Sequence, residues 1–364
     1  MKLKFQANQK DDFFTVVKKR VEQDFAIQAK SCHANWQMWL KTLLLLVAYV
    51  TCYGALISNS FSFNGVLLLY CGLGIIKPLI GFNVTHDALH GAYSHHHKLN
   101  RFLGYSFDIN GTSSYIWKIT HNVLHHTYTN IPGHDSDIDK AIWLRLSPKD
   151  EVYWFHRYQP YYAPFLYCLT SLNWILFFDP VWFYRGAING KVPPKDTAIF
   201  TTLKIFSLFF FIGLPMYLLS LSWWQVLLGY FCMQFVGGFM IALVFQLAHI
   251  VESVAFPEPD SVGRMANNWA THELLTTSNF ATHNRVLSYF LGGLNFQIEH
   301  HLFPNVCHVH YPHISKIVKK TTEEFGLPYN EQPTFFQAIG SHFRMLGKLG
   351  RGEILSNPEV REDL

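Results

Sequence analysis

Residues Ile205 to Val251 read IFSLFFFIGLPMYLLSLSWWQVLLGYFCMQFVGGFMIALVFQLAHIV, 47 residues without a single Asp, Glu, Lys or Arg. A polar interruption at Ser220 to Gln225 divides this stretch. A run of 18 or more apolar residues without charges is typical of a membrane-spanning helix. We therefore expect two such helices here, forming a hairpin over residues 205–248.

A second apolar stretch lies nearer the N-terminus. Residues Thr42 to Thr85 are 44 residues with one charge, Lys77. As a helix they would reach roughly 66 Å at 1.5 Å per residue, whereas a bilayer core is about 30 Å thick. Two spans joined near Asn59 to Ser62 accommodate this length. The predicted fold class is an all-α, multi-pass membrane protein with four transmembrane helices in two hairpins, residues 41–85 and 205–248.

The composition agrees with this fold class. Apolar residues make up 49% of the chain and charged residues only 15%, against about 25% charged in ordinary soluble domains. A net charge of +4 without a basic stripe argues against nucleic acid as a partner. The six cysteines include no C-x-x-C pair, which argues against a disulfide scaffold and against a cysteine metal site.

Basic residues near the span ends predict the orientation. Residues 1–41 contain eight Lys or Arg, and the connectors 59–64 and 220–225 contain none. Basic residues favour the cytoplasmic side. We therefore expect one membrane domain whose N-terminal segment 1–40, cap segment 86–204 and cap and tail 249–364 are cytoplasmic, in a bacterial inner membrane or the endoplasmic reticulum.

Two further segments have a less direct interpretation. Tyr161 to Phe178 is 18 uncharged residues and long enough for a fifth span. Pro160, Pro164 and the Asp179-Pro180 pair favour instead a bent helix at the membrane interface. The tail after Pro333 is basic, and we expect a loosely held surface segment.

Histidines at helical spacing mark the candidate site. Residues four apart lie on one face of a helix, and this spacing occurs three times close to apolar runs. Seven histidines form three clusters and an eighth stands alone at the end of the fourth span: His86 and His90; His121, His125 and His126; His300 and His301 with Gln297 four residues before the latter; and His249.

These clusters predict a metal centre. One His pair is more often a surface pair than a ligand set, but the predicted topology places all three sets on one membrane face. Neutral imidazole is the commonest protein metal ligand. Eight imidazoles exceed the four ligands of a zinc site, so two metal ions are expected. Ligand type alone leaves Zn, Cu, Fe and Ni open.

Other groups are interpreted as structural. His272-Glu273-Leu274-Leu275-Thr276 misses the zinc-protease pattern at its last position. The acidic loop His134 to Asp139 resembles a calcium loop only superficially. The remaining histidines are not expected to bind metal, although the second set could contact an acyl head group: His95, His96 and His97; His308, His310 and His313.

The three motifs carry a resemblance. His86-Asp87-x-x-His90, His121-x-x-x-His125-His126 and Gln297-x-x-His300-His301 resemble the three histidine boxes of the membrane fatty acid desaturase family over roughly residues 40 to 325. Gln in the third box is similar to the "front-end" subgroup, which inserts a double bond between an existing one and the carboxyl end.

The resemblance implies a four-span helical protein with a cytoplasmic cap, two non-haem Fe ions and an acyl chain in an apolar tunnel. It implies as ligands the eight histidines above, with His249 as the isolated one and Gln297 as a further candidate. Stearoyl-type members have Asn four residues before the isolated His, where this chain has Phe245. Asp87 and Glu299 could orient ligand rings by accepting an N–H, or they could cap helices or face water.

The leading hypothesis for function is an acyl desaturase that uses O2 and two external electrons on an acyl-CoA or acyl-lipid. A hydroxylase of the same metal architecture is the nearest alternative. A metal transporter predicts ionisable groups within the spans, yet residues 205–248 contain no charged residue. The chain has no His-Pro-Gly-Gly signature of a fused cytochrome, so we expect a separate electron donor, a ferredoxin or a b-type cytochrome.

Overall fold

The computed structural model describes residues 3–7, 12–139, 142–185, 190 and 192–353. The described residues are mostly helical, with one parallel pair of two-residue strands, β1 (Asn279–Phe280) and β2 (Glu331–Gln332). The chain forms two compact units. The first unit contains residues 1–33, 120–163 and 244–364, and the second contains residues 34–119 and 164–243. The all-α prediction is confirmed.

The second unit contains the first apolar hairpin. Helix α2 (Trp36–Ile57) begins after Asn35, whose side chain accepts a hydrogen bond from the Met38 backbone N–H at 3.0 Å. Helix α3 (Phe63–Ile80) continues through the π-helix η1 (Gly81–Thr85) into α4 (His86–Leu89). The turn between α2 and α3 lies at residues 58–62, as predicted.

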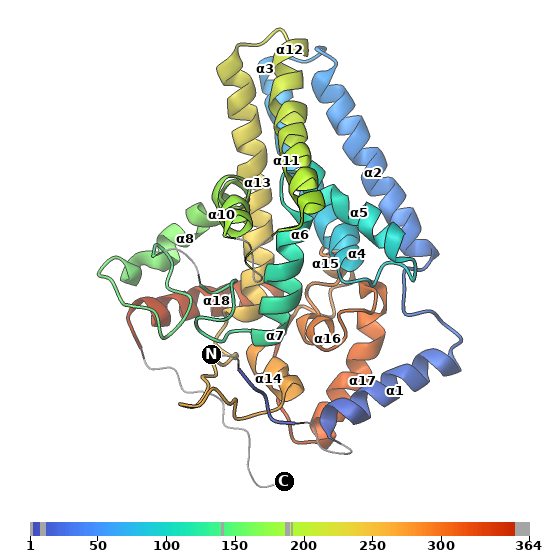
Figure 1. Cartoon of the computed structure of the whole chain (residues 1–364), viewed down its shortest axis with the longest axis vertical. Helices are drawn as coiled ribbons and strands as arrows, with labels where there is room; N and C mark the ends of the chain where they lie inside the picture. The colour runs from blue at the N-terminus through green and yellow to red at the C-terminus, as the bar shows by residue number, and fades with distance from the viewer. Residues whose placement is uncertain (1–2, 8–11, 140–141, 186–189, 191, 354–364) are drawn as a thin grey trace. The chain divides into compact units, whose positions relative to one another are not determined.

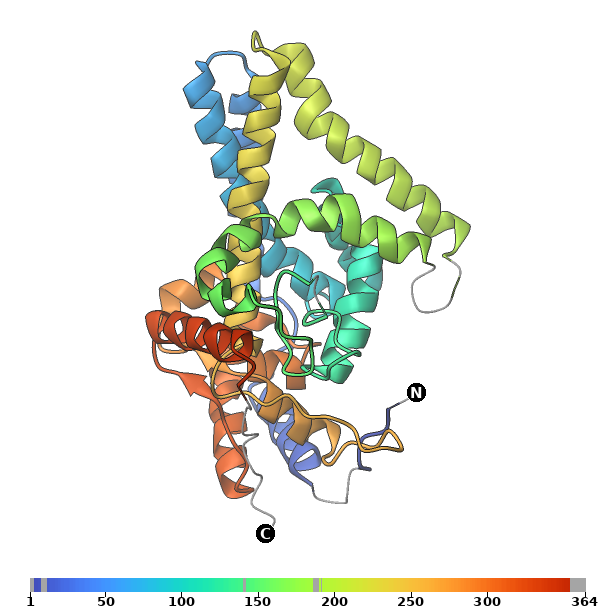
Figure 2. The same ribbon diagram turned by 90° about the vertical axis from the view of Figure 1, so that its left-hand side faces the viewer.

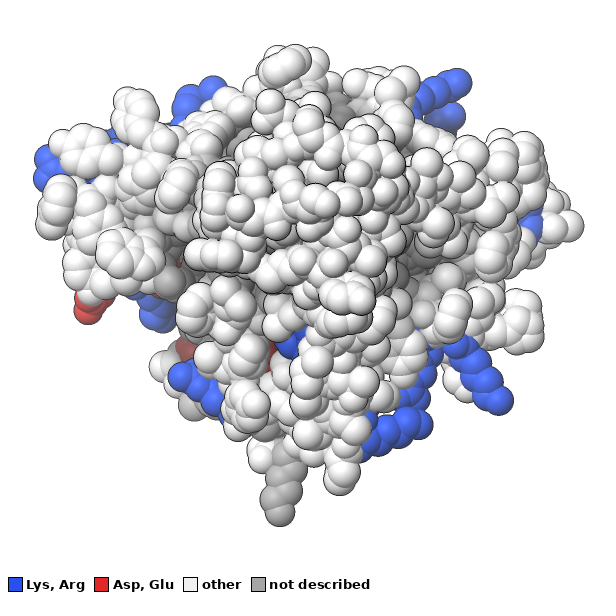
Figure 3. All heavy atoms as spheres, turned by 90° about the horizontal axis from the view of Figure 1, so that it is seen from above, with Lys and Arg blue, Asp and Glu red and all other residues white. Residues whose placement is uncertain are grey.

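The second hairpin begins with α11 (Pro194–Leu208), η5 (Phe209–Gly213) and α12 (Leu214–Leu218), and returns as α13 (Trp223–His249). Residues 244–249 of α13 belong to the first unit. Figure 3 looks onto the end where the turn at 219–222 lies, and most of the residues in view are uncharged. Four helices of the described chain are long and apolar enough to cross a membrane: Trp36–Ile57, Phe63–Leu89, Pro194–Leu218 and Trp223–His249.

These helices extend beyond the predicted hairpin limits of 41–85 and 205–248. Two of the predicted limits lie at Lys41 and beside Lys204, and the helices continue through both residues, which have partners in the structure. Lys41 donates to Asn83 Oδ1 at 2.7 Å. Lys204 forms an ion pair with Asp179 at 3.2 Å. A paired cation can be accommodated near the end of an apolar helix at lower cost than an isolated one.

The segment that resembled a fifth span is bent. A helical stretch from η3 (His156–Tyr158) through α8 (Gln159–Cys168) meets a second stretch of α9 (Thr170–Asn173), η4 (Trp174–Phe178) and α10 (Asp179–Tyr184) at 61°. The predicted bend is therefore present. By length and composition, the pair would count as a fifth span only if both halves crossed together.

Close packing between α3 and α13 depends on a glycine. A Cβ added at Gly74 would lie 2.6 Å from the backbone oxygen of Met233, whereas one added at Gly54 on α2 would meet nothing within 4 Å. Small residues allow helices in membranes to approach closely.

Gly74→Val is therefore expected to destabilise the second unit by roughly 1–3 kcal/mol, because overpacking forces the helices apart. Thermal unfolding of the purified protein in detergent measures the loss. Gly54→Val is the matched control and should unfold within a few degrees of the unmodified chain. Equal unfolding temperatures for the two variants would contradict the close packing.

The first unit is built from short helices. In Figures 1 and 2, α1 (Phe13–Ile27) lies along α17 (Tyr311–Glu324), and the buried residues Val17, Leu274, Ile298 and Ile314 share one apolar core. Its other helices include η2 (Lys118–His125), which begins in the second unit, α7 (His126–Tyr128), α14 (Trp269–Thr276), α15 (Arg285–Phe290), α16 (Gln297–Leu302) and η6 (His308–His310). In the second unit, α5 (His97–Ile109) and α6 (Ser114–Trp117) complete the set.

The tail after Pro333 is not loosely held, which corrects that prediction. Helix α18 (Phe335–Gly350), red in Figure 2, begins after Thr334, whose hydroxyl accepts from the Gln337 N–H at 3.2 Å. It buries Leu346 and Leu349 completely. His342, also fully buried, donates from Nδ1 to the Ile250 carbonyl at 2.7 Å. The basic residues of this helix concealed its apolar face in the sequence. Residues 354–364 of the expected tail lie outside the described residues.

Candidate metal centre

The second histidine cluster lies on a π-helix. Residues Lys118–His125 form η2, and His126 follows at the start of α7. A π-helix closes hydrogen bonds between residues five apart, so residues four and five positions apart both lie about one turn away on the same face. The ring centroid of His121 is accordingly 5.1 Å from that of His125 and 4.7 Å from that of His126. An α-helix would direct His126 away from His121.

The third cluster lies on α16, in the same unit. The Asn279 side chain holds the start of this helix, because its Oδ1 accepts from the Ile298 N–H at 2.9 Å. His300 and His301 are buried, with ring centroids 5.4 Å apart. Gln297 is also buried, and its amide donates from Nε2 to the Leu294 carbonyl at 2.8 Å.

The fold brings these histidines together with the isolated one. One nitrogen from each of His125, His249 and His301 lies within 4.8 Å of the other two. The same holds for His126, His300 and His301. His301 therefore belongs to both trios, which we call the His249 trio and the His300 trio after one member of each.

The His249 trio has the chemistry of a metal site. The Nε2 atoms of His125 and His249 are buried and have no hydrogen-bond partner among the described residues. A buried nitrogen without a partner costs about 1–3 kcal/mol, and a metal ion bound to it would remove that cost. Imidazole nitrogens converging in a buried position are the donor set that a transition metal ion takes.

A buried carboxylate orients His125. Asp135 is fully buried, and both of its oxygens lie 3.1 Å from His125 Nδ1. The backbone N–H groups of Asn130 and Asp137 donate to Asp135 at 2.9 and 2.8 Å and fix it. Burial by itself lowers the pKa of His125, but the carboxylates of Asp135 and Asp137 outweigh it and raise the pKa to about 9. A hydrogen held on Nδ1 leaves Nε2 as the metal-binding nitrogen.

A second buried carboxylate orients His301. The ring donates from Nδ1 to Glu273 Oε2 at 2.7 Å, and the Thr129 hydroxyl donates to the same oxygen at 2.9 Å. The neighbouring His272 donates from Nε2 to the Thr129 carbonyl at 2.8 Å. His272 therefore supports the site through the backbone of Thr129.

Sequence reasoning missed Asp135 and Glu273. Both lie in segments that were compared with a calcium loop and a zinc protease and were set aside because they did not match. The signal that could have found them is the general rule that metal-binding histidines commonly donate to a carboxylate, which makes every Asp and Glu near a histidine cluster a candidate. Glu299, which sequence reasoning suggested for this role, instead accepts from Asn279 at 2.8 Å and Tyr329 at 3.0 Å. Burial raises the pKa of Glu299 to about 7.

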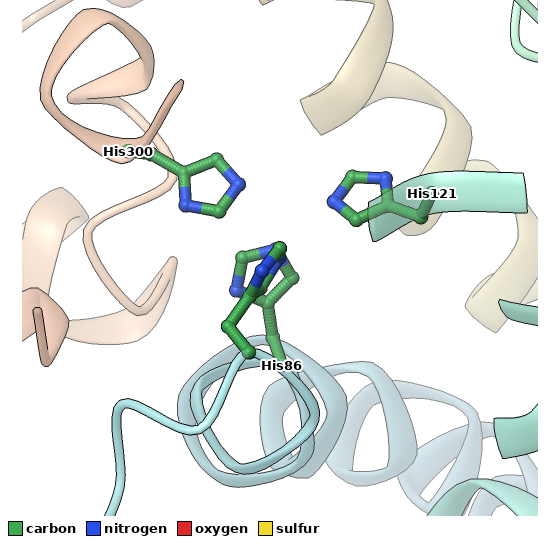
Figure 4. A group of neighbouring side chains, drawn as sticks. His86, His121 and His300 are labelled. Atoms are coloured by element: carbon green, nitrogen blue, oxygen red, sulfur yellow. The ribbon is translucent and has the colours of Figure 1, made fainter. Parts of the chain in front are cut away.

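The first cluster belongs to the second unit. His86 and His90 have ring centroids 4.7 Å apart. Both contact the edge of Trp117, at 5.5 and 5.4 Å between centroids. Asp87, between them, is buried and does not face water. In Figure 4, His86 is labelled on its helix. The same figure labels His121 and His300 of the first unit, whose nearly parallel rings have centroids 6.0 Å apart.

The residues interpreted as structural lie in other surroundings. His95, His96 and His97 are exposed, as expected for a solvated turn. His313 contacts Asp24, and His310 donates to the His33 carbonyl. Phe245, one turn before His249, lies with its ring 5.9 Å from that of His121.

Comparison with known proteins identifies the family of this chain. The sequence model of the family described as "Fatty acid desaturase" matches residues 60–333. The "sn-1 linoleoyl-lipid 6-desaturase" of Synechocystis sp. is 37% identical, over 94% of this chain and 97% of that protein. The "Acyl-lipid (8-3)-desaturase" of Physcomitrium patens is 35% identical, over 96% of this chain and 74% of that protein.

A third relative is the "Probable Delta(5) fatty acid desaturase C" of Dictyostelium discoideum, 31% identical over 95% of this chain and 77% of that protein. These relatives are desaturases of the front-end type, which confirms the resemblance seen in the histidine boxes. The chain belongs to the fatty acid desaturase family of oxidoreductases.

Proposed function

We propose that this protein inserts a double bond into an already unsaturated acyl chain carried by a membrane lipid, between the existing double bond and the carboxyl end. The observation that carries the proposal is the buried meeting of the second and third histidine clusters with His249 in the first unit. The relatives named as acting on acyl-lipids support a lipid rather than acyl-CoA as the carrier.

The proposed cofactor is a pair of non-haem Fe ions. When bound, the irons supply the oxidising power that removes two hydrogens from adjacent methylene groups, with O2 and two electrons consumed. The identity of the metal rests on the family. The ligands proposed are eight histidines: His86, His90, His121, His125, His126, His249, His300 and His301. Five of them form the His249 and His300 trios. His86 and His90 are included because of their spacing in the sequence, and Gln297 is a further candidate.

The residues around the ligands have two tasks in this proposal. Asp135 and Glu273 hold the rings of His125 and His301 in the orientation that binds metal. Burial of His126, His300 and His301 keeps bulk water from the site. Exclusion of water prevents side reactions of a strong oxidant.

We also propose that the site faces the cytoplasm and that electrons arrive from a separate b-type cytochrome or ferredoxin. The support is the excess of Lys and Arg in residues 1–41 over the two short connectors. A bacterial inner membrane and the endoplasmic reticulum both fit this orientation.

Expression in a host that lacks polyunsaturated lipids tests the function. We expect a new fatty acid that has lost two hydrogens, with the new double bond on the carboxyl side of an existing one. Mass spectrometry of derivatised fatty acids locates the bond. His125→Ala should give no product while the protein stays in the membrane. A product that has gained one oxygen instead would identify a hydroxylase.

A further inference from the structure

A cavity of about 160 Å³ with both polar and apolar lining residues lies within the second unit. Its polar lining includes Arg101, Tyr105 and Asp108 on α5, Ser114 and Lys118 on and after α6, and Asp196 on α11. Leu89, which also lines it, ends one candidate membrane span, and Asp196 is in the first turn of another. The cavity is therefore at the level of the span ends, where lipid headgroups meet protein.

One wall of the cavity is a buried carboxyl group with an unused oxygen. Asp108 is only 5% exposed, and its Oδ1 accepts from the Ser114 N–H at 3.2 Å. Its Oδ2 is buried and has no hydrogen-bond partner among the described residues. Burial raises the pKa of Asp108 to about 6. A buried carboxylate oxygen of this kind requires a hydrogen-bond donor, and the cavity is where a ligand could bring one.

Two positively charged side chains, Arg101 and Lys118, also line the cavity. Lys118 is exposed and forms no ion pair with any described carboxylate. Arg101 has a long 3.8 Å ion pair with Asp196, and it donates from Nε to the Tyr105 hydroxyl at 2.9 Å. Two neighbouring cations favour an anion beside them, and Arg and Lys are both common phosphate-binding residues.

We infer that this cavity binds the headgroup of the lipid that carries the acyl chain, with its phosphate at Arg101 and Lys118 and an N–H or O–H donor of the headgroup at Asp108. The inference rests on the proposed function, which supplies a lipid-bound chain. The cavity is smaller than the roughly 300 Å³ of pockets that hold drug-sized ligands. Its volume suits a small headgroup.

The position of the cavity suits a substrate carrier. Leu89 immediately precedes His90, and Lys118 immediately follows Trp117, which contacts both His86 and His90. A headgroup held here would lie beside the first histidine box, within the same unit. Its phosphate would thereby fix where along the acyl chain the reaction begins, counted from the carboxyl end.

Headgroup binding by the full chain, purified in detergent, tests the inference without turnover. The probes are phosphatidylethanolamine, which has N–H donors, phosphatidylcholine, which has none, and inorganic phosphate. Native mass spectrometry measures bound lipid. We expect phosphatidylethanolamine to bind at least tenfold more tightly than phosphatidylcholine. Lys118→Gln should weaken both lipids tenfold or more, and Asp108→Asn should abolish the preference between them. Lys195→Gln, on α11 but outside the lining, is the charge-matched control.

Each outcome has one meaning. If Lys118→Gln binds both lipids like Lys195→Gln, or if Asp108→Asn keeps the preference, the headgroup site is refuted even where wild-type desaturation is observed. If inorganic phosphate competes as well as the lipid does, the cavity is a free-phosphate site, and a lipid source is refuted. If charge-dependent lipid binding is found but the wild-type chain never makes product, the proposed function fails and the site stands.

Discussion

Replacing His301 by alanine is expected to abolish product and to lower the metal content of the chain below that of the unmodified protein. His301 is the histidine common to the His249 and His300 trios. Its Nδ1 donates to Glu273, so Nε2 is the nitrogen left for a metal ion, and its loss removes one ligand of the candidate centre. The loss also takes one donor from the buried Glu273, while the Thr129 hydroxyl still donates to it. Losing a hydrogen-bond partner of a buried polar atom costs about 1–3 kcal/mol. Elemental analysis of the purified protein measures the metal, and fatty acid analysis of the host measures the product.

The control for this variant is another fully buried histidine in the first unit. His342 donates to the Ile250 carbonyl and lies in neither trio. His342→Ala should lower thermal stability, because it removes a hydrogen bond and leaves a cavity. It should retain the metal content of the unmodified chain. Retention of the unmodified metal content by His301→Ala would contradict the assignment of His301 as a ligand.

Asp135→Asn is expected to lower metal affinity by roughly 10- to 100-fold, the usual effect of removing the group that orients a ligand histidine. Asparagine keeps the size of the side chain but loses the charge that holds the proton on His125 Nδ1. The variant should therefore remain folded and lose metal to a chelator more readily. Competition with a chromogenic chelator measures the affinity, and product formation should fall in parallel.

Glu299→Gln is the matched control for Asp135→Asn. Glu299 is also fully buried and is next to His300, but its hydrogen bonds come from Asn279 and Tyr329 rather than from a ring. A general effect of neutralising a buried acid near the site would lower metal affinity equally in both variants. An orienting role for Asp135 requires a larger loss in Asp135→Asn, and equal losses would count against it.

The membrane architecture could be predicted because it follows from composition. Long uncharged stretches have few alternatives to a membrane-spanning helix, so both hairpins were expected. The connectors were expected near 59–62 and at 220–225, and the second is shorter in the structure because α13 begins at Trp223. The limits of the helices were not, because charged residues such as Lys41 and Lys204 have partners that only tertiary structure supplies. The burial of α18 was missed for a similar reason, since its charges suggested an exposed segment.

The site was predictable to the extent that its ligands follow a short-range pattern. Spacing identified the histidine clusters, whereas the acids that orient them come from 10 and 28 positions away, Asp135 for His125 and Glu273 for His301. No periodicity connects such pairs, because loop conformation decides which carboxylate reaches which ring. The π-helix could not be predicted either, because the sequence of residues 118–126 is equally compatible with an α-helix.

The π-helix η2 has a consequence for how the first unit acquires its centre during folding. Three imidazoles from only six consecutive residues, His121 to His126, arrive on one face as soon as that single turn forms. The first unit then has to join only two further segments, those of His249 and of His300 and His301. Every additional segment would require another loop to close, with its own loss of chain entropy. The unusual turn thus lowers the entropic cost of gathering many ligands in one place.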